Sequence, residues 1–222
     1  DTMAYQYYEQ LGLLDLWDEI DTAVLDAMPA DINPDIFWAA GKLVALHHEP
    51  APVMMMDTDL IVWKPLEQEV EGKALVGVHR DETYGIYPNK EDLKLPPCYA
   101  FHPRWDWEVL PVNTALAWFG DETFKQYYTS CAIHFMRDNQ ELPMERVSQM
   151  VTAEQRILPM CATELGLPIH TFLDDYYEPA EREFTHIWGC KELASDKQCN
   201  ETLCSALLER MEEEFTAYSP NI

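Results

Sequence analysis

The 222-residue sequence has few basic side chains, with 15 Lys and Arg against 40 Asp and Glu and a net charge of −25. A surface of this kind repels a phosphate backbone, which excludes a nucleic-acid partner. A free nucleotide would also be repelled, unless a bound cation inverted the local field. For most of these carboxylates, however, the simplest explanation is that they keep the protein in solution.

Paired cysteines and long apolar runs are also lacking. The six cysteines (98, 131, 161, 190, 199 and 204) form no Cys-x-x-Cys pair, which predicts reduced thiols in a cytoplasmic protein. No apolar run is long enough for a transmembrane segment, and no signal peptide is visible. The length and the 47% apolar content predict one α/β domain over residues 1–222. Because the chain starts at Asp1 in a helical pattern, we expect a fragment whose beginning is missing.

The most informative stretch is Val53-Met-Met-Met-Asp-Thr-Asp59. Four apolar residues followed by two carboxylates predict a buried, central parallel strand that is covered by helices on both faces and ends in an acidic loop. Ligands of parallel sheets bind beyond such strand ends, and Asp57 and Asp59 could face one cation there. Carboxylate oxygens suit Mg²⁺ or Mn²⁺. Alternatively, Asp57 only closes the strand with an Asx-turn and Asp59 is solvated.

Helices and strands alternate along the rest of the chain. We expect helices over 2–11, from the N-cap Asn33 through His47, from Asp121 through Phe135, from the capping box Thr152–Gln155, and over 196–217. We expect further strands near 23–25 and over 74–78, 112–119 and 168–173. The helix after Thr152 is expected to bend or stop before Pro159. This alternation predicts an α/β structure with a largely parallel sheet.

Residues 79–108 read as a long irregular loop, which is usually functional. Its aromatic residues Tyr84, Tyr87, Tyr99, Trp105 and Trp107 could stack on a sugar or a base, or could equally cover the edge of the sheet.

A second polar stretch, Phe184–Lys191, is the best candidate to converge on the two aspartates. His186 could supply an imidazole ligand for Mn²⁺, Gly189 allows close approach of the backbone, and Lys191 could bind phosphate. The alternative is that His186 is an ordinary packed or surface histidine.

Four segments, in order, together resemble glycosyltransferases of the GT-A fold, closest to the glycogenin-like and galactosyltransferase-like enzymes of family 8. They are Phe37-Trp-Ala-Ala-Gly-Lys42, Met54-Met-Met-Asp-Thr-Asp-Leu-Ile-Val-Trp-Lys-Pro-Leu66, Val112-Asn-Thr-Ala-Leu-Ala-Trp-Phe-Gly120 and Thr185-His-Ile-Trp-Gly-Cys-Lys191. The resemblance implies a Rossmann-like, three-layer α/β/α sandwich whose first strand precedes Asp1. Two details depart from the family pattern: Lys191 is one residue closer to Gly189, and Asn113 lacks a following glycine.

The resemblance also implies an enzyme that moves a sugar from a UDP- or GDP-sugar to a glycan or other acceptor. Asp57, Asp59 and His186 would hold Mn²⁺ or Mg²⁺ as metal ligands. The donor would be bound by Lys42, Asp57, Thr58, Asp59, Asn113, Gly189 and Lys191. Asn113, Glu154 and Gln155 would lie at the transferred sugar as the catalytic residues.

Two other classes stay open. The Met-Met-Met-Asp-Thr-Asp stretch also has the form of a haloacid-dehalogenase-type phosphatase motif, with Asp57 as nucleophile, Asp59 as acid/base and Asp174-Asp175 as a late Mg²⁺ pair. A phosphatase would leave Asn113 and His186 without a role. The third class is a non-catalytic, glycosyltransferase-like binding protein.

Overall fold

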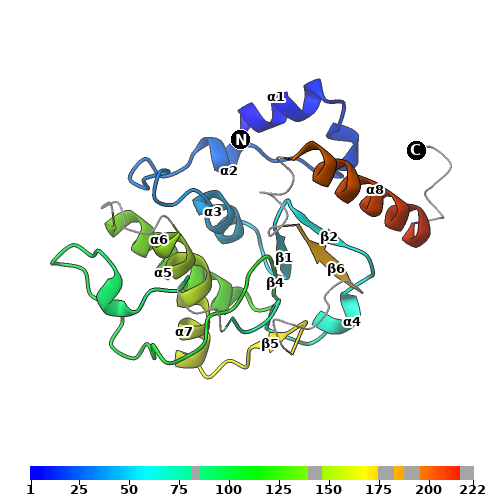
Figure 1. The fold of residues 1–222 in the computed structure, drawn as a ribbon. Helices are drawn as coiled ribbons and strands as arrows, with labels where there is room; N and C mark the ends of the chain where they lie inside the picture. The colour runs from blue at the N-terminus through cyan, green and yellow to red at the C-terminus, as the bar shows by residue number, and fades with distance from the viewer. Residues whose placement is uncertain (82–85, 140–146, 175–182, 188–195, 216–222) are drawn as a thin grey trace.

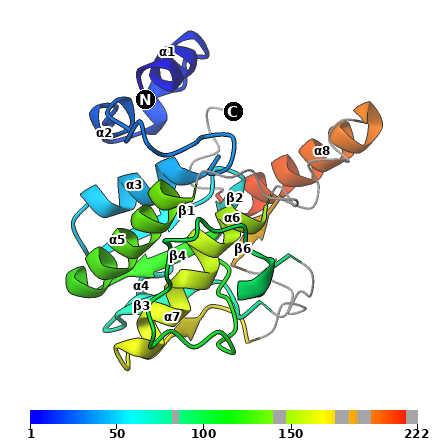
Figure 2. The ribbon, with the colours of Figure 1, turned by 90° about the vertical axis from the view of Figure 1, so that its left-hand side faces the viewer.

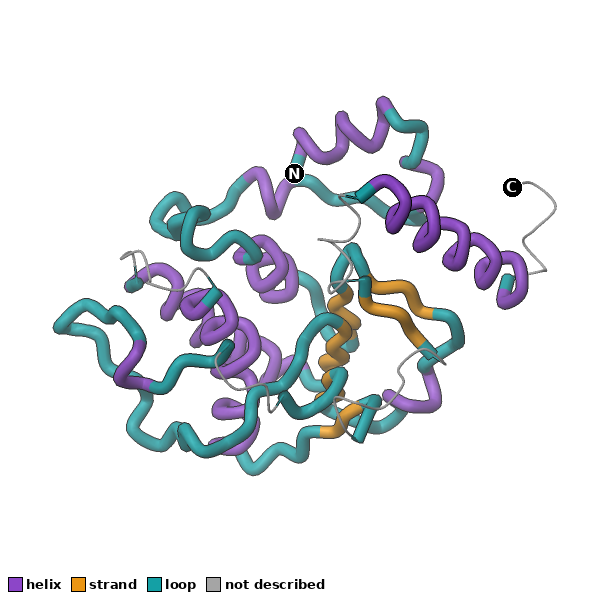
Figure 3. The backbone as a smooth tube through the Cα atoms, viewed as in Figure 1, coloured by secondary structure: helices purple, strands orange, loops and turns teal. Residues whose placement is uncertain are grey.

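A computed structural model describes residues 1–81, 86–139, 147–174, 183–187 and 196–215 (Figure 1). Its α-helices are α1 (Thr2–Gln10), α2 (Ala23–Asp26), α3 (Ala40–His48), α4 (Glu67–Val70), α5 (Glu122–Asp138), α6 (Ser148–Val151), α7 (Ile157–Glu164) and α8 (Lys197–Glu214). Two 3₁₀ helices, η1 (Leu14–Leu16) and η2 (Lys90–Asp92), and one π-helical turn, η3 (Thr152–Arg156), complete the helical part. The strands are β1 (Val53–Met56), β2 (Leu60–Val62), β3 (Leu75–Gly77), β4 (Leu116–Phe119), β5 (His170–Thr171) and β6 (Phe184–His186). Loops and turns make up much of the chain between these short elements (Figure 3).

The main sheet has the strand order β1-β4-β3-β5. Strand β4 pairs antiparallel with both β1 and β3, and only β3 and β5 are parallel. The chain is therefore α/β with a mixed sheet, and the prediction of a largely parallel sheet is wrong for the described residues. Strand β1 exists where the sequence placed it, but it lies at the edge of this sheet rather than in its centre. Consistent with this position, it is not uniformly buried, and Met56 is 47% exposed.

The two faces of the sheet are covered differently. Along β4, Ala117 and Phe119 join the core that the long helices α3, α5 and α7 form, whereas Leu116 belongs to a smaller core on the other face. Figure 2 shows these helices stacked on one side of the sheet. The smaller core lies against a two-stranded antiparallel sheet of β2 and β6, in which Leu60 pairs with His186. Helices were expected on both faces. In the described part, a second sheet takes the place of one helical layer.

Helix α5 is the centre of the larger core. Asp121 caps it as predicted, because its side chain accepts a hydrogen bond from the Phe124 backbone N–H at 2.7 Å. Phe124, Tyr128 and Phe135 are fully buried beneath the sheet. Tyr128 stacks on Phe119 with a centroid separation of 5.9 Å, which joins this helix to β4. The predicted C-terminal helix is also confirmed as α8, with Asp196 as its N-cap.

Three local predictions are wrong. Residues 23–26 form the short helix α2 rather than a strand. Asn33 opens a turn, in which its side chain accepts from the Asp35 N–H at 2.9 Å, and the helix α3 begins only at Ala40. Thr152 is not a cap, because its hydroxyl donates back to the Ser148 carbonyl at 2.8 Å inside a continuing helix.

In its described residues, 79–81 and 86–108, the loop is irregular as predicted, apart from η2 and an isolated bridge between Arg80 and Val112. Four of its aromatic residues pack into the core: Tyr99 contacts Phe135 edge-on, Phe101 stacks on Phe135, and Trp105 and Trp107 contact Phe101. Tyr99, Trp105 and Trp107 therefore act as packing residues, but they pack on Phe101 and the helix α5 rather than on the edge of the sheet. Tyr84 lies outside the described residues. The Tyr87 hydroxyl hydrogen-bonds Asp81 and Gln155, as described below.

Candidate functional site

The two aspartates lie in a turn between β1 and β2. The backbone fixes them, because the Asp57 N–H donates to the Ala115 carbonyl at 2.8 Å and the Asp57 carbonyl accepts from Leu60 at 3.1 Å. The Asp59 carbonyl accepts from the Ile187 N–H at 2.9 Å, just beyond the end of β6. The acidic turn between β1 and β2 and the end of β6 are thus held together by a main-chain hydrogen bond.

His186 converges on both carboxylates, as the sequence predicted. Its Nε2 lies 3.9 Å from Asp57 Oδ2 and 3.6 Å from Asp59 Oδ1, and one ligand atom of each residue lies within 4.8 Å of the others. An ion that sits about 2.1 Å from each of two ligands holds them roughly 3 to 4.2 Å apart, so the two distances from His186 fit one Mg²⁺ or Mn²⁺. Among the described residues, this is the one group of three His, Cys, Asp or Glu side chains so closely placed. The donor set therefore fits a hard divalent cation.

Lys42, on α3, supplies a positive charge at this cluster. Its Nζ lies 2.5 Å from Asp57 Oδ1 and also forms an ion pair with the Glu154 carboxylate. Burial alone would lower the pKa of Lys42, but the charges of Glu154 and Asp57 raise it above its ordinary value. The two oxygens of Asp57 thus have separate neighbours: Oδ1 meets the lysine, and Oδ2 faces His186.

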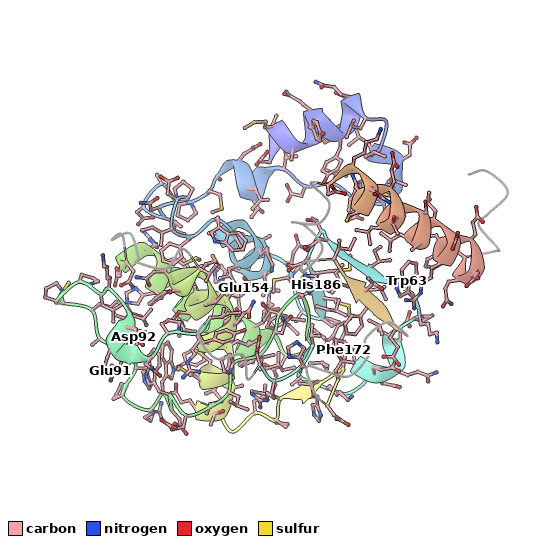
Figure 4. The ribbon with its side chains drawn as sticks, in the orientation of Figure 1. Trp63, Glu91, Asp92, Glu154, Phe172 and His186 are labelled. Atoms are coloured by element: carbon pink, nitrogen blue, oxygen red, sulfur yellow. The ribbon has the colours of Figure 1, made fainter. Side chains whose placement is uncertain are left out.

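Glu154 is almost fully buried, with a side chain that is 5% exposed. In addition to Lys42, its carboxylate accepts a hydrogen bond from the Thr114 hydroxyl at 2.8 Å, and its backbone carbonyl accepts from the Tyr128 hydroxyl at 2.6 Å. Figure 4 shows Glu154 and His186 in the central part of the molecule, far from Glu91 and Asp92 in the η2 loop. The predicted site residue Glu154 is therefore joined to Asp57 through the shared lysine.

The π-helical turn η3 explains how neighbouring residues reach the site. A π turn inserts an extra residue into a helix and is frequent at functional sites. Pro159 has no N–H, so it cannot bind the carbonyl of Gln155, four residues earlier. That carbonyl accepts instead from the Val112 N–H at 3.1 Å. Of the predicted bend or stop before Pro159, the stop is wrong, because the helix continues through this residue. The released Gln155 carbonyl joins the helix to the chain before β4.

Gln155 leads to two residues that the sequence did not single out as a pair. The Tyr87 hydroxyl hydrogen-bonds both Gln155 Oε1 and Asp81 Oδ2, the latter at 2.8 Å. Asp81 is 6% exposed. Thr114, whose hydroxyl donates a hydrogen bond to the Glu154 carboxylate, was also not predicted. The available signal was the position of these polar residues relative to the strands: Asp81 follows the strand over 75–77, and Thr114 precedes the strand over 116–119. Because the two strands are antiparallel, both residues lie at the same end of the sheet.

The remaining predicted site residues are placed less decisively. The Asn113 side chain accepts from the Ala115 N–H at 3.0 Å, and its main chain is paired with Val78 and His79. Thr58 is exposed at the tip of the acidic turn. Gly189 and Lys191 lie outside the described residues, as does Asp175 of the alternative phosphatase pair, whose neighbour Asp174 is exposed.

A separate cleft of about 390 Å³ lies on the outer side of α5. It is lined by Asp31, His47, Ser130, Ile133, His134, Arg137 and Asp138. None of these residues belongs to the Asp57–Asp59–His186 cluster, so the cleft has no part in that site.

Residues 22–222 match DUF6734, a family of unknown function. The chain belongs to this family. The DUF6734 match contains the metal-ligand cluster, Lys42, Glu154 and the Tyr87 network, whereas α1 lies outside it. The comparisons with curated proteins and with solved structures gave no match. Among the described residues, no helix combines the length and the apolar composition that a membrane span needs.

Proposed function

We propose that this DUF6734 protein is a metal-dependent glycosyltransferase that moves a sugar from a UDP- or GDP-sugar to a glycan or another acceptor. One observation supports this above all: His186, far from Asp57 and Asp59 in the sequence, converges on both carboxylates at distances that fit a single hard cation. A net charge of −25 would otherwise repel a nucleoside diphosphate, so a donor of this kind needs local positive charge.

The proposed donor site divides its tasks among the described residues. Asp57 Oδ2, Asp59 Oδ1 and His186 Nε2 would hold Mn²⁺ or Mg²⁺. When bound, this cation would screen the diphosphate and stabilise the charge that develops on the leaving group. Lys42 fixes Asp57 from the opposite side and leaves the second oxygen of that carboxylate to the metal.

Glu154 would orient the transferred sugar, because its carboxylate is joined to the cluster through Lys42, and Gln155, the next residue in the chain, would assist it. Asn113, in the chain before β4, would also lie at the transferred sugar. Lys191 would assist at the phosphates. Reduced cysteines support a cytoplasmic location, since Cys98, Cys131, Cys161, Cys199 and Cys204 are all free thiols.

A thermal-shift titration with UDP and GDP, each with and without Mn²⁺, tests the proposal. We expect stabilisation only when metal and one nucleotide are both present, by about 2.7 kcal/mol at a hundredfold excess over Kd. Asp59→Asn should abolish it. Glu91→Gln, which changes an exposed acid in η2, should leave it intact.

Two other outcomes would change the proposed function. Stabilisation by inorganic phosphate with Mg²⁺, and by neither nucleotide, would refute the transferase and favour the phosphatase with Asp57 as nucleophile. Stabilisation by Mn²⁺ alone, with no added effect of a nucleotide, would leave a metal-binding protein without a donor site.

A further inference from the structure

Two free thiols meet where the helices α5 and α7 pack against each other in the larger core (Figure 2). Cys131 lies on α5 and Cys161 on α7. A contact beside them fixes how the two helices face, because the Tyr127 hydroxyl donates to Glu164 Oε2 at 2.6 Å. Tyr127 lies four residues before Cys131, and Glu164 three residues after Cys161, so each residue shares a helix face with its cysteine. Accordingly, the Cys161 thiol hydrogen-bonds the Cys131 sulfur.

The two thiols differ in their access to solvent. Cys161 is 0% exposed, whereas Cys131 is only half-buried at the margin of the same core. A dissolved reagent therefore reaches the α5 thiol first, and the α7 thiol is placed to react with its neighbour. Neither cysteine contacts the Asp57–Asp59–His186 cluster, so the proposed metal chemistry leaves both without a role.

Their acidities differ in the same sense. The hydrogen bond from Cys161 lowers the pKa of the Cys131 thiol below its ordinary value, and the same bond, together with burial, raises the pKa of Cys161. The charge of Glu164 acts against ionisation of Cys131, but it is offset by Arg104, whose guanidinium lies 2.6 Å from that carboxylate. An accessible thiolate beside a second thiol is the arrangement of redox-sensing cysteines.

We propose that Cys131 and Cys161 form a reversible oxidation site, at which hydrogen peroxide leads to a disulfide between α5 and α7. The Cys131 thiolate attacks one peroxide oxygen, the O–O bond breaks, and a sulfenic acid and a hydroxide result. The Cys161 sulfur then attacks the Cys131 sulfur, the S–O bond breaks, and water leaves with the Cys161 proton. The hydroxide takes up the proton that Cys131 had lost. Two thiols are thus oxidised by two electrons, and one peroxide is reduced to two waters.

Peptide mapping of the wild-type protein after treatment with hydrogen peroxide tests this. Trypsin separates the two cysteines, because Arg137, Arg146 and Arg156 lie between them. We expect a linked pair of peptides that is about 2 Da lighter than their sum and is cleaved by dithiothreitol. The link should have formed at the dose that oxidises half of Cys98, an exposed thiol.

Three variants test the order of the steps. In Cys161→Ala the second thiol is missing, so a sulfenic acid should accumulate at Cys131 and be trapped by dimedone. In Cys131→Ser the buried Cys161 should stay reduced at the same dose. Cys98→Ser, the matched control at an exposed cysteine, should leave the linked peptides unchanged. Melting curves of the reduced variants establish that each is folded, and the wild-type map does not depend on any substitution.

Several outcomes would overturn the inference. One is the absence of the linked peptides when half of Cys98 is oxidised, and another is a link from Cys131 to a different cysteine. A link found only in covalent dimers on a non-reducing gel would also refute a disulfide within one chain. Trapping of a sulfenic acid at Cys161 in Cys131→Ser would show that Cys131 is not the thiol that reacts first. None of these results bears on the proposed transferase, because the oxidation site does not share its residues.

Discussion

Lys42→Met is the substitution that most directly tests the charge arrangement of the site. Methionine keeps most of the volume of the lysine stem but removes the ammonium that lies 2.5 Å from Asp57 Oδ1 and pairs with Glu154. Two carboxylates would then remain close together without their shared cation. Glu154 would be the more costly of the two, because its side chain is 5% exposed whereas that of Asp57 is 25% exposed.

Removing one partner of a buried ion pair typically costs 3–5 kcal/mol, and we expect about 3 kcal/mol here because Lys42 and Asp57 keep some contact with water. Glu154→Gln alone should cost about 1 kcal/mol, since Thr114 can still donate to the amide oxygen and Lys42 keeps Asp57. The double variant should be more stable than the sum of the single effects predicts, with a coupling of about 2 kcal/mol.

Urea denaturation of the four proteins measures these free energies of unfolding. Lys197→Met, at a lysine whose side chain is 90% exposed, is the control and should change stability by less than about 0.5 kcal/mol. The folded-state pKa of Lys42 lies above the ordinary 10.5, so its contribution is complete below that pH and is lost only as pH rises through the folded value. A cost below about 1 kcal/mol, or a coupling near zero, would refute the shared ion pair.

Three other substitutions test the packing. Phe135→Ala should lower the free energy of unfolding by about 3–5 kcal/mol in urea, because the ring is fully buried. Gly77→Ala should cost about 1–3 kcal/mol, because the new Cβ would lie 2.2 Å from Val112 Cγ1, and Val112→Ala in the same chain should recover part of it. Burial raises the pKa of Tyr128 well above 10.0, so the folded state holds a proton that the unfolded state loses. Stability should therefore fall between about pH 9 and 11, and Tyr128→Phe should fall less in the same urea series.

Local signals in the sequence predicted several elements well. The strand over 53–56, the cap at Asp121 and the final helix after Asp196 all depend on neighbouring residues, and the structure confirms them. The convergence of His186 on Asp57 was also predictable, because the two stretches have the residue types of a metal site. Whether the site binds metal stays a prediction.

The relative direction of neighbouring strands could not be predicted from such local signals. Four apolar residues in a row predict a strand, but they do not specify its partner or the direction of that partner. Here β1 pairs antiparallel with β4, and its Met56 is exposed. The apolar run therefore forms an edge strand and not a central one. Similarly, the sequences of β2 and β6 did not indicate that these two strands form a separate sheet.

The local structure around Glu154 and Gln155 could not be predicted from the sequence. Thr152-Ala-Glu-Gln looked like a helix start, and Pro159 predicted a bend or a stop, whereas both lie within one continuing helix that contains a π turn. The missing N–H of Pro159 leaves the Gln155 carbonyl to bind Val112, while the Glu154 carbonyl binds Tyr128. These tertiary hydrogen bonds replace the helical ones and hold the π turn against β4. A proline that would be expected to end or bend a helix here lies within one, next to the π turn that holds Glu154 where Lys42 joins it to Asp57.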